Sequence, residues 1–202
     1  MTAVPAQHET PETICQWATA TFGDGGTDLH AGVRLMEEVA ELVVCVVEFE
    51  SYDVEPEVLM ESPSIREALD RIYPKMREEA ADVAIVLARL TQRLMGHTTA
   101  VDFGRIRTGS GWHPYARHAA ALNMATAKLL KALRETDGVV PPSTGWSPTT
   151  REVHAALCDV LGNFHVLTEE LRLQDVIDAK MQINRARKWT VIGGHGQHVV
   201  GT

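Results

Sequence analysis

Apolar residues recur at helical spacing along most of the chain and predict a protein built from α-helices. A recurrence at i, i+3, i+4 and i+7 is typical of a helix with one buried face. No stretch alternates strongly enough between apolar and polar residues to predict a strand. The helices are expected at residues 11–22, 29–50, 75–95, 114–135, 151–173 and 174–189, with a short helical turn at 64–72.

Capping residues, prolines and glycines mark the expected boundaries. Thr10 and Asp28 are expected as N-caps of the first two helices, and Gly96 as the end of the third. The stretch 51–74 is polar and contains three prolines, so it is expected to interrupt the helices. Residues 1–202 are interpreted as one domain, in which 190–202 form a glycine-rich, flexible tail.

Composition and charge narrow the classes of function. Of the 202 residues, 45% are hydrophobic, enough for a packed core, and only 5% are aromatic. A net charge of -8 argues against a protein that coats nucleic acid, because it repels the phosphate backbone. Three widely spaced cysteines, the lack of a secretion signal and the lack of a membrane span favour the cytoplasm and no membrane partner.

Two acidic motifs lie at the edges of strongly apolar helices. The first is Glu37-Glu38-x-x-Glu41 and the second is Glu79-x-x-Asp82. Residues three apart share a helix face, so Glu38 should lie beside Glu41, and Glu79 beside Asp82. Helices that are apolar nearly all round are buried, and carboxylates brought into a core need compensation.

A divalent cation would provide that compensation. Rigidly held carboxylate oxygens suit Mg²⁺ or Mn²⁺, and four carboxylates from two antiparallel helices would leave room for substrate phosphates. The competing interpretation is that each acidic pair is an ordinary solvated helix face, as most such pairs are.

The last expected helix carries a row of basic and amide side chains. Lys180, Asn184 and Arg187 follow at i, i+4 and i+7 and share one face, while Arg185 and Lys188 lie on a neighbouring strip. Such a row can hold a polyphosphate chain. The alternative is that these cations only favour the negative end of the helix dipole.

Together these motifs resemble the MazG-like family of all-α nucleoside triphosphate pyrophosphohydrolases. The family pattern is EExxE, then ExxD on a later helix, then K-x-x-x-N-x-x-R downstream, and all three occur here in that order. The ending at residues 184–189 and the early Gln16-Trp17 look like the phage and bacterial dATP/dGTP enzymes of the MazZ type. The resemblance covers about residues 14–95 and 174–189, whereas 97–173 hold extra helices without a counterpart.

The resemblance implies an activity and a set of roles. It implies a MazG-like helical bundle that cuts a purine (d)NTP, dGTP or dATP, to the monophosphate and pyrophosphate. Two or three Mg²⁺ or Mn²⁺ ions would be held by Glu38, Glu41, Glu79 and Asp82. The phosphates would be held by Lys180, Asn184 and Arg187, with Lys188 nearby.

The resemblance leaves other roles open. Glu37 or Glu38 is a candidate to orient the attacking water, and the sequence does not choose between them. Ile14, Trp17 and Phe22 could line a base pocket, although Trp17 could equally be part of the core. The family typically assembles as homodimers or homotetramers, so an oligomer is expected.

The chain lacks the motifs of three other classes of helical or nucleotide-binding protein. A di-iron bundle needs Glu-x-x-His, a His-Asp phosphohydrolase needs a His-Asp dipeptide, and a nucleotide-binding α/β fold needs a glycine-rich loop; this chain has none of these motifs. The remaining alternative is a non-enzymatic helical scaffold, in which the acidic and basic motifs are surface charge.

Overall fold

The computed structural model describes residues 8–23, 26–52, 62–98, 101, 115–137, 148–169, 171–192 and 195–198. The expectation of a predominantly α-helical protein is confirmed over these residues, with one small hairpin near the end. None of their helices combines the length and apolar character that a membrane span requires. The elements are α1 (Pro11–Phe22), α2 (Asp28–Glu50), α4 (Pro63–Met95), α5 (Tyr115–Thr136), α6 (Pro148–Thr168), α7 (Gln174–Ala186), β1 (Trp189–Ile192) and β2 (His195–His198).

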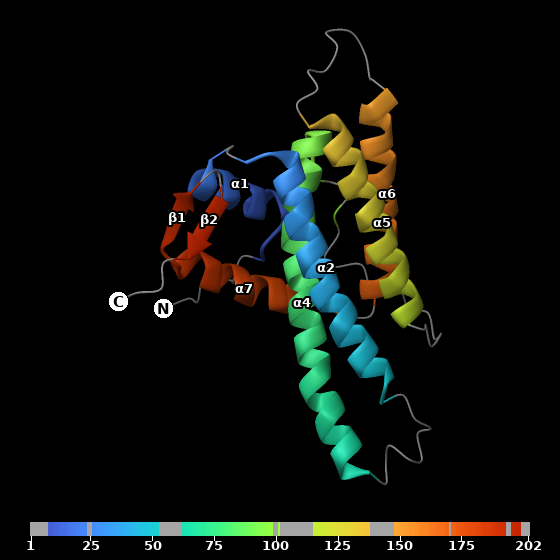
Figure 1. Ribbon diagram of the computed structural model, residues 1–202. Coiled ribbons are helices and arrows are strands. Elements are labelled where there is room, and N and C mark those ends of the chain that lie inside the picture. The colour runs from blue at the N-terminus through green and yellow to red at the C-terminus, as the bar shows by residue number, and fades with distance from the viewer. Residues whose placement is uncertain are drawn as a thin grey trace.

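Helices α2, α4, α5 and α6 run side by side as a bundle (Figure 1). α2 packs against α4 on one side and α5 on the other, and α6 closes the bundle by contacting both α5 and α4. This explains why Leu35, Val39, Leu42 and Val46, at i, i+4, i+7 and i+11, are fully buried. Helices α5 and α6 belong to the segment that has no counterpart in the resemblance. Here α5 covers the back of α2, the helix that carries the first acidic motif, and α6 packs on α5 and α4.

Gly32 marks the closest approach of α2 to α5. A Cβ atom at this position would lie 2.6 Å from Cδ1 of Leu133 and 3.4 Å from Cδ1 of Leu130. The missing side chain therefore lets two leucines of α5 pack directly on the α2 backbone.

α4 is longer than the sequence predicted. The expected break before residue 75 is wrong, because one helix continues from Pro63 to Met95 with Pro74 inside it. An interior proline removes a backbone hydrogen bond and costs about 3 kcal/mol. Ala68, Ile72 and Met76 are buried at i, i+4 and i+8 around it, and their packing offsets that cost.

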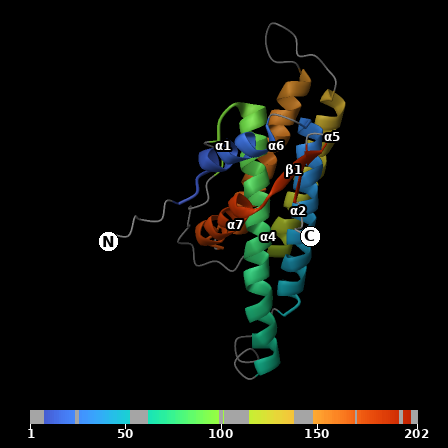
Figure 2. The same cartoon turned by 90° about the vertical axis from the view of Figure 1, so that its left-hand side faces the viewer.

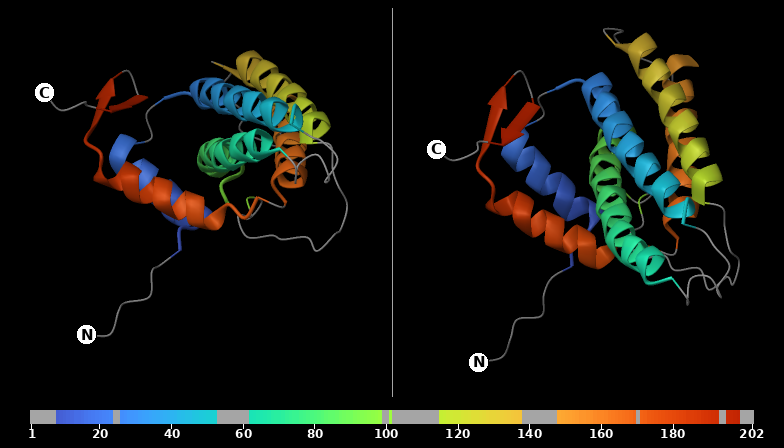
Figure 3. Two further views of the ribbon diagram at one scale, coloured as in Figure 1. Left: turned by 90° about the horizontal axis from the view of Figure 1, so that it is seen from below. Right: turned by 60° about the horizontal axis from the view of Figure 1, so that its bottom comes forward.

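α1, α7 and the hairpin form a second layer, in which α1 and α7 lie against α4 and the hairpin contacts α1 (Figures 2 and 3). α1 has its expected bounds. Thr10 accepts a hydrogen bond from the backbone of Thr13, and the Thr13 hydroxyl accepts one from the backbone of Thr10, which completes a capping box.

The C-terminal region differs from the expectation in three ways. α6 ends at Thr168 rather than residue 173, and α7 ends at Ala186 rather than Trp189. The expected absence of strands is also wrong, because part of the supposed flexible tail forms an antiparallel hairpin that pairs Trp189 with His198 and Ile192 with His195. The missed signal is a pair of glycines directly after the β-branched run Thr190-Val191-Ile192.

Gly32→Val is expected to lower the free energy of unfolding by about 1–3 kcal/mol, the usual cost of overpacking a core. The valine would push Leu133 away from α2. Urea unfolding followed by circular dichroism measures the change. Gly162→Val in α6 is the matched control, because a Cβ there meets nothing within 4 Å, and its stability should not fall. Equal losses in the two variants would contradict the close contact of α2 with α5.

Candidate functional site

Three of the four predicted metal-binding carboxylates lie together where α2 packs on α4. Glu38 and Glu41 come from α2 and Glu79 from α4, and each offers an oxygen within 4.8 Å of the others. The i, i+3 spacing places the first two on one face, and the packing of the helices brings the third across. We call these three residues the acidic cluster.

Glu38 is the most buried member of the acidic cluster, with only 3% of its surface exposed. Its carboxylate forms an ion pair with Arg34, one turn earlier on α2. Burial raises the pKa of Glu38 to about 7 in spite of this partner, and the neighbouring carboxylates of Asp82, Glu41 and Glu79 add to the rise. The negative charge of this side chain is therefore destabilising, and a positively charged ligand beside it would be favoured.

Glu41 and Glu79 meet at the outer side of the acidic cluster. Glu41 is exposed and Glu79 is partly buried. Burial raises the pKa of Glu79 against the pull of Lys180, and a hydrogen bond with the Glu41 carboxyl raises it further. Two carboxyl groups in direct contact share a proton or a cation, since two charged groups at this distance repel each other.

Asp82 lies one turn along α4 from Glu79, and its carboxylate accepts a hydrogen bond from the ammonium of Lys180 on α7. The predicted metal-binding set is thus divided: three members form the acidic cluster, while the fourth is paired with a residue from the predicted phosphate-binding set. This ion pair directly joins the two motifs that the sequence analysis treated separately.

Lys180, Asn184 and Arg187 still face the same side of the structure, although α7 ends at Ala186, one residue before Arg187. Arg187 is the C-cap and has extended backbone angles. Its guanidinium donates a hydrogen bond of 3.2 Å to the Asn184 side-chain oxygen. All three residues line one cavity, and we call them the basic row. Lys188 is exposed and is not among the residues that line this cavity.

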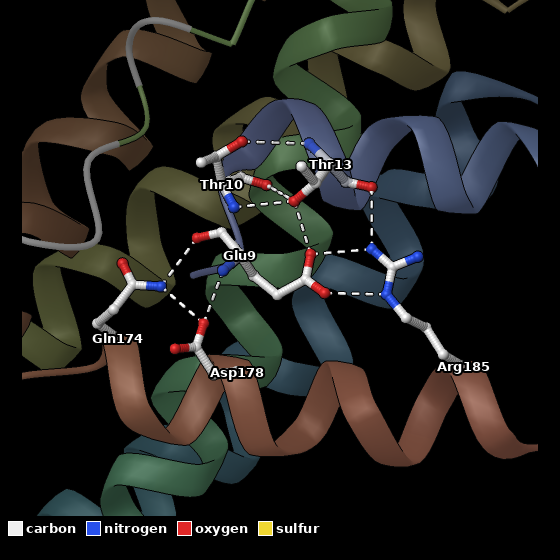
Figure 4. A network of polar contacts seen from close by, with 6 residues as sticks. All are labelled: Glu9, Thr10, Thr13, Gln174, Asp178 and Arg185. Carbon is white, nitrogen blue, oxygen red and sulfur yellow. Dashed lines mark hydrogen bonds and ion pairs between the residues drawn. The ribbon is translucent and has the colours of Figure 1, made fainter. Parts of the chain in front are cut away.

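A polar network fixes α7 against the start of α1 (Figure 4). The Arg185 guanidinium donates two hydrogen bonds of 2.9 Å to the Glu9 carboxylate, which also accepts one of 2.6 Å from the Thr13 hydroxyl. Partial burial raises the pKa of Glu9, but these bonds outweigh it and hold the pKa below its usual value. At the other end of the network, Asp178 accepts hydrogen bonds from the Glu9 backbone and from Gln174.

Arg77 holds the start of α7 to α4. Its guanidinium donates to the backbone oxygen of Leu171 at 2.6 Å and pairs with Asp175 at 2.6 Å. With one anchor near each end, α7 presents its basic row toward the acidic residues of α4.

An aromatic cluster closes the far end of the cavity. Trp17, Phe22 and Trp189 meet edge to face, with ring centroids 5.2 to 6.1 Å apart. The Trp189 indole donates a hydrogen bond of 2.9 Å to the backbone oxygen of Asn184, which ties the cluster to α7. Arg89 of α4 lies over the Phe22 ring at 5.4 Å. Trp17 is partly buried: it lines the cavity and also packs against the hydrophobic core.

A cavity of about 910 Å³ lies between the bundle and the second layer. Of the acidic cluster, Glu38 lines this cavity, whereas Glu41 and Glu79 lie outside its lining. Glu38, Glu78 and Asp82 line it from the bundle, and the basic row lines it from α7. Ile14 and the aromatic cluster form its apolar end. A volume of this size, with an apolar end and a few converging polar groups, is typical of a small-molecule site.

The structure adds three arginines that the sequence did not predict, and one of them, Arg93, pairs with Asp28. Arg34, Arg89 and Arg93 all line the cavity. Arg34 could have been found, because it stands three and four residues before Glu37 and Glu38, the spacing of a helical ion pair. Arg89 has no such local signal, since its contact with Phe22 depends on how α1 packs against α4.

Glu38→Gln is expected to raise the free energy of unfolding by about 1–2 kcal/mol in EDTA at pH 8, because it removes a buried charge from among other carboxylates. Arg34 would lose a partner but is more than half exposed. Urea unfolding measures the effect. The control Glu37→Gln removes a carboxylate that is 55% exposed, and it should change stability by less than about 0.5 kcal/mol. A clear loss of stability in Glu38→Gln would show that the ion pair outweighs the repulsion.

Comparison of the chain with protein families, with curated proteins and with solved structures gave no match. The function of the cavity is therefore argued from its own residues: carboxylates on one wall, cations on the next and aromatic rings at the end.

Proposed function

We propose that this protein is a metal-dependent nucleoside triphosphate pyrophosphohydrolase. The observation that carries the proposal is the cavity itself, which joins carboxylates, a basic row and an aromatic cluster in one space of about 910 Å³. A nucleoside triphosphate has matching parts: a polyphosphate that needs cations and a base that stacks on aromatic rings. The order of the acidic and basic motifs, which resembles that of the MazG-like family, supports the same assignment.

The acidic cluster fits a hard divalent cation. Its oxygens belong to three carboxylates, the ligand type that Mg²⁺ and Mn²⁺ prefer, and its buried member lacks the solvent that would otherwise stabilise its charge. Glu38, Glu41 and Glu79 would hold the ion or ions, with Asp82 available once Lys180 turns to the substrate. Bound Mg²⁺ or Mn²⁺ would neutralise the triphosphate and polarise its phosphoryl oxygens.

The basic row supplies phosphate ligands from α7. Arg187 and Lys180 offer charged donors, and Asn184 offers an amide between them. Because Trp189 is bonded to the backbone of Asn184, the phosphate ligands and the aromatic end of the cavity are fixed to one another. A bound purine nucleotide would place its base against Trp17 and its phosphates along α7.

The reaction is a hydrolysis at the α-phosphorus. Water attacks, a new P–O bond forms, the bond between the α-phosphorus and its bridging oxygen breaks, and pyrophosphate leaves. Glu38 is the better candidate to orient this water, since it lines the cavity, whereas Glu37 is exposed and does not line it. The Glu38 carboxylate would accept the water proton. dGTP and dATP are the substrates that the resemblance favours.

Purified protein with Mg²⁺ or Mn²⁺ and a panel of NTPs and dNTPs is expected to release a nucleoside monophosphate and pyrophosphate, with purine deoxynucleotides turned over fastest. Asp82→Asn and Glu41→Gln should each lower kcat/KM by about 100-fold or more, since even an outer partner of a metal ligand is worth about 10- to 100-fold. Chromatography of the products measures this. The control is Glu67→Gln, an exposed residue of α4 outside the cavity. Absence of turnover with every nucleotide and both metals would reject the enzyme and favour a helical scaffold.

Mn²⁺ is expected to raise the melting temperature, because an ion that binds only the folded chain stabilises it by about 2.7 kcal/mol at 100 times its Kd. Glu41→Gln should remove most of this response, since it deletes one member of the acidic cluster. Differential scanning calorimetry with and without Mn²⁺ makes the measurement, with NaCl at equal ionic strength as the control. An equal rise in the variant and the unaltered protein would place the ion elsewhere.

A further inference from the structure

We propose that Arg34 is a polyphosphate-binding residue which the acidic side chains of α2 hold until a divalent cation replaces it. This inference rests on the proposed function for the identity of the ligand, and it assigns a role to a residue outside both the acidic and the basic motif. It also predicts that cation binding and polyphosphate binding strengthen each other.

The contacts of Arg34 divide its guanidinium between two carboxylates. One terminal nitrogen lies 2.9 Å from the carboxylate of Glu37, and the other pairs with that of Glu38. Glu38 is 3% exposed and belongs to the acidic cluster. Arg34 thus supplies the positive charge that this buried carboxylate requires.

A divalent cation in the acidic cluster would compete for that position. It carries twice the charge of a guanidinium and would bind the same carboxylate, while like charges at a few ångströms repel each other. The Arg34 side chain is 58% exposed, so it can move away from Glu38 without disrupting core packing.

Arg34 lines the cavity from α2, whereas the basic row lines it from α7. Once displaced, its planar guanidinium would offer paired donors that match a phosphate group. A polyphosphate would then be held from two walls. Lys180 repeats the arrangement on the other wall, since it pairs with Asp82 and would turn to the substrate in the same way.

The coupling follows from these two exchanges. The cation must displace Arg34 from Glu38, and this lowers the affinity for the cation. A polyphosphate that binds the displaced guanidinium compensates for that loss of affinity. Each ligand therefore raises the affinity for the other by the same factor. Direct attraction between the cation and the polyphosphate adds to this coupling, so the share that Arg34 contributes is measured by substituting Arg34.

Arg34→Gln should change the two affinities in opposite directions: that for the cation should rise and that for polyphosphate should fall. We expect Mn²⁺ alone, measured from the electron paramagnetic resonance signal of the unbound ion, to bind about tenfold more tightly than in the unaltered chain. Sodium tripolyphosphate, titrated at saturating Mn²⁺ and followed by tryptophan fluorescence, should bind about tenfold more weakly. Arg71→Gln is the matched control, since Arg71 forms a 3.8 Å surface pair with Glu48 and should leave both affinities unchanged.

Unchanged or weaker Mn²⁺ binding in Arg34→Gln would overturn the proposal, and so would unchanged tripolyphosphate binding. If that variant does not fold, Arg34→Lys carries the test: its single ammonium cannot span two carboxylates as the guanidinium does, so Mn²⁺ should again bind more tightly and tripolyphosphate more weakly. Neither titration needs turnover. Opposite shifts without nucleotide hydrolysis would therefore reject the proposed function alone, and hydrolysis without these shifts would reject the role of Arg34 alone.

Discussion

The carboxylate of Glu38 lies in the contact between α2 and α4, and the arrangement of the site follows from the need to balance its charge. Arg34 balances it from the same helix, while Glu41 and Glu79 add negative charge beside it. Hydrophobic packing of α2 and α4 is what keeps these carboxylates together against their repulsion. The cluster of carboxylates lowers the free energy of unfolding, and the burial of leucines and valines compensates for that loss.

The second layer depends on a different kind of contact. α7 buries few side chains, chiefly Ile177 and Met181, and its position is set largely by polar bonds to the start of α1 and to α4. Directional bonds fix the rotation of a helix better than apolar contacts do. The basic row is therefore aimed at the cavity by Arg185 and Arg77, two residues that take no part in lining it.

Local signals in the sequence were enough for much of the fold. The capping box of Thr10 set the start of α1, and the i, i+3 spacing placed Glu38 beside Glu41, because both depend on neighbours within one turn. The break expected at Pro74 does not occur, because the cost of a proline inside α4 is outweighed by packing that only the folded chain provides. The meeting of Trp17 with Trp189 had no local signal either, because it results from how the two ends of the described chain pack.

The bundle also bears on how the protein responds to dilution. α5 packs on α2, and α6 packs on α5 and α4, so the bundle core behind the acidic cluster is buried within the same chain, while Val44 and Val47 of α2 stay exposed. Where two chains each contribute half of a bundle, folding is a bimolecular event and weakens as the concentration falls. Here the bundle core forms within one chain, and an oligomer, which stays a prediction, would cover apolar side chains of α2 that are exposed.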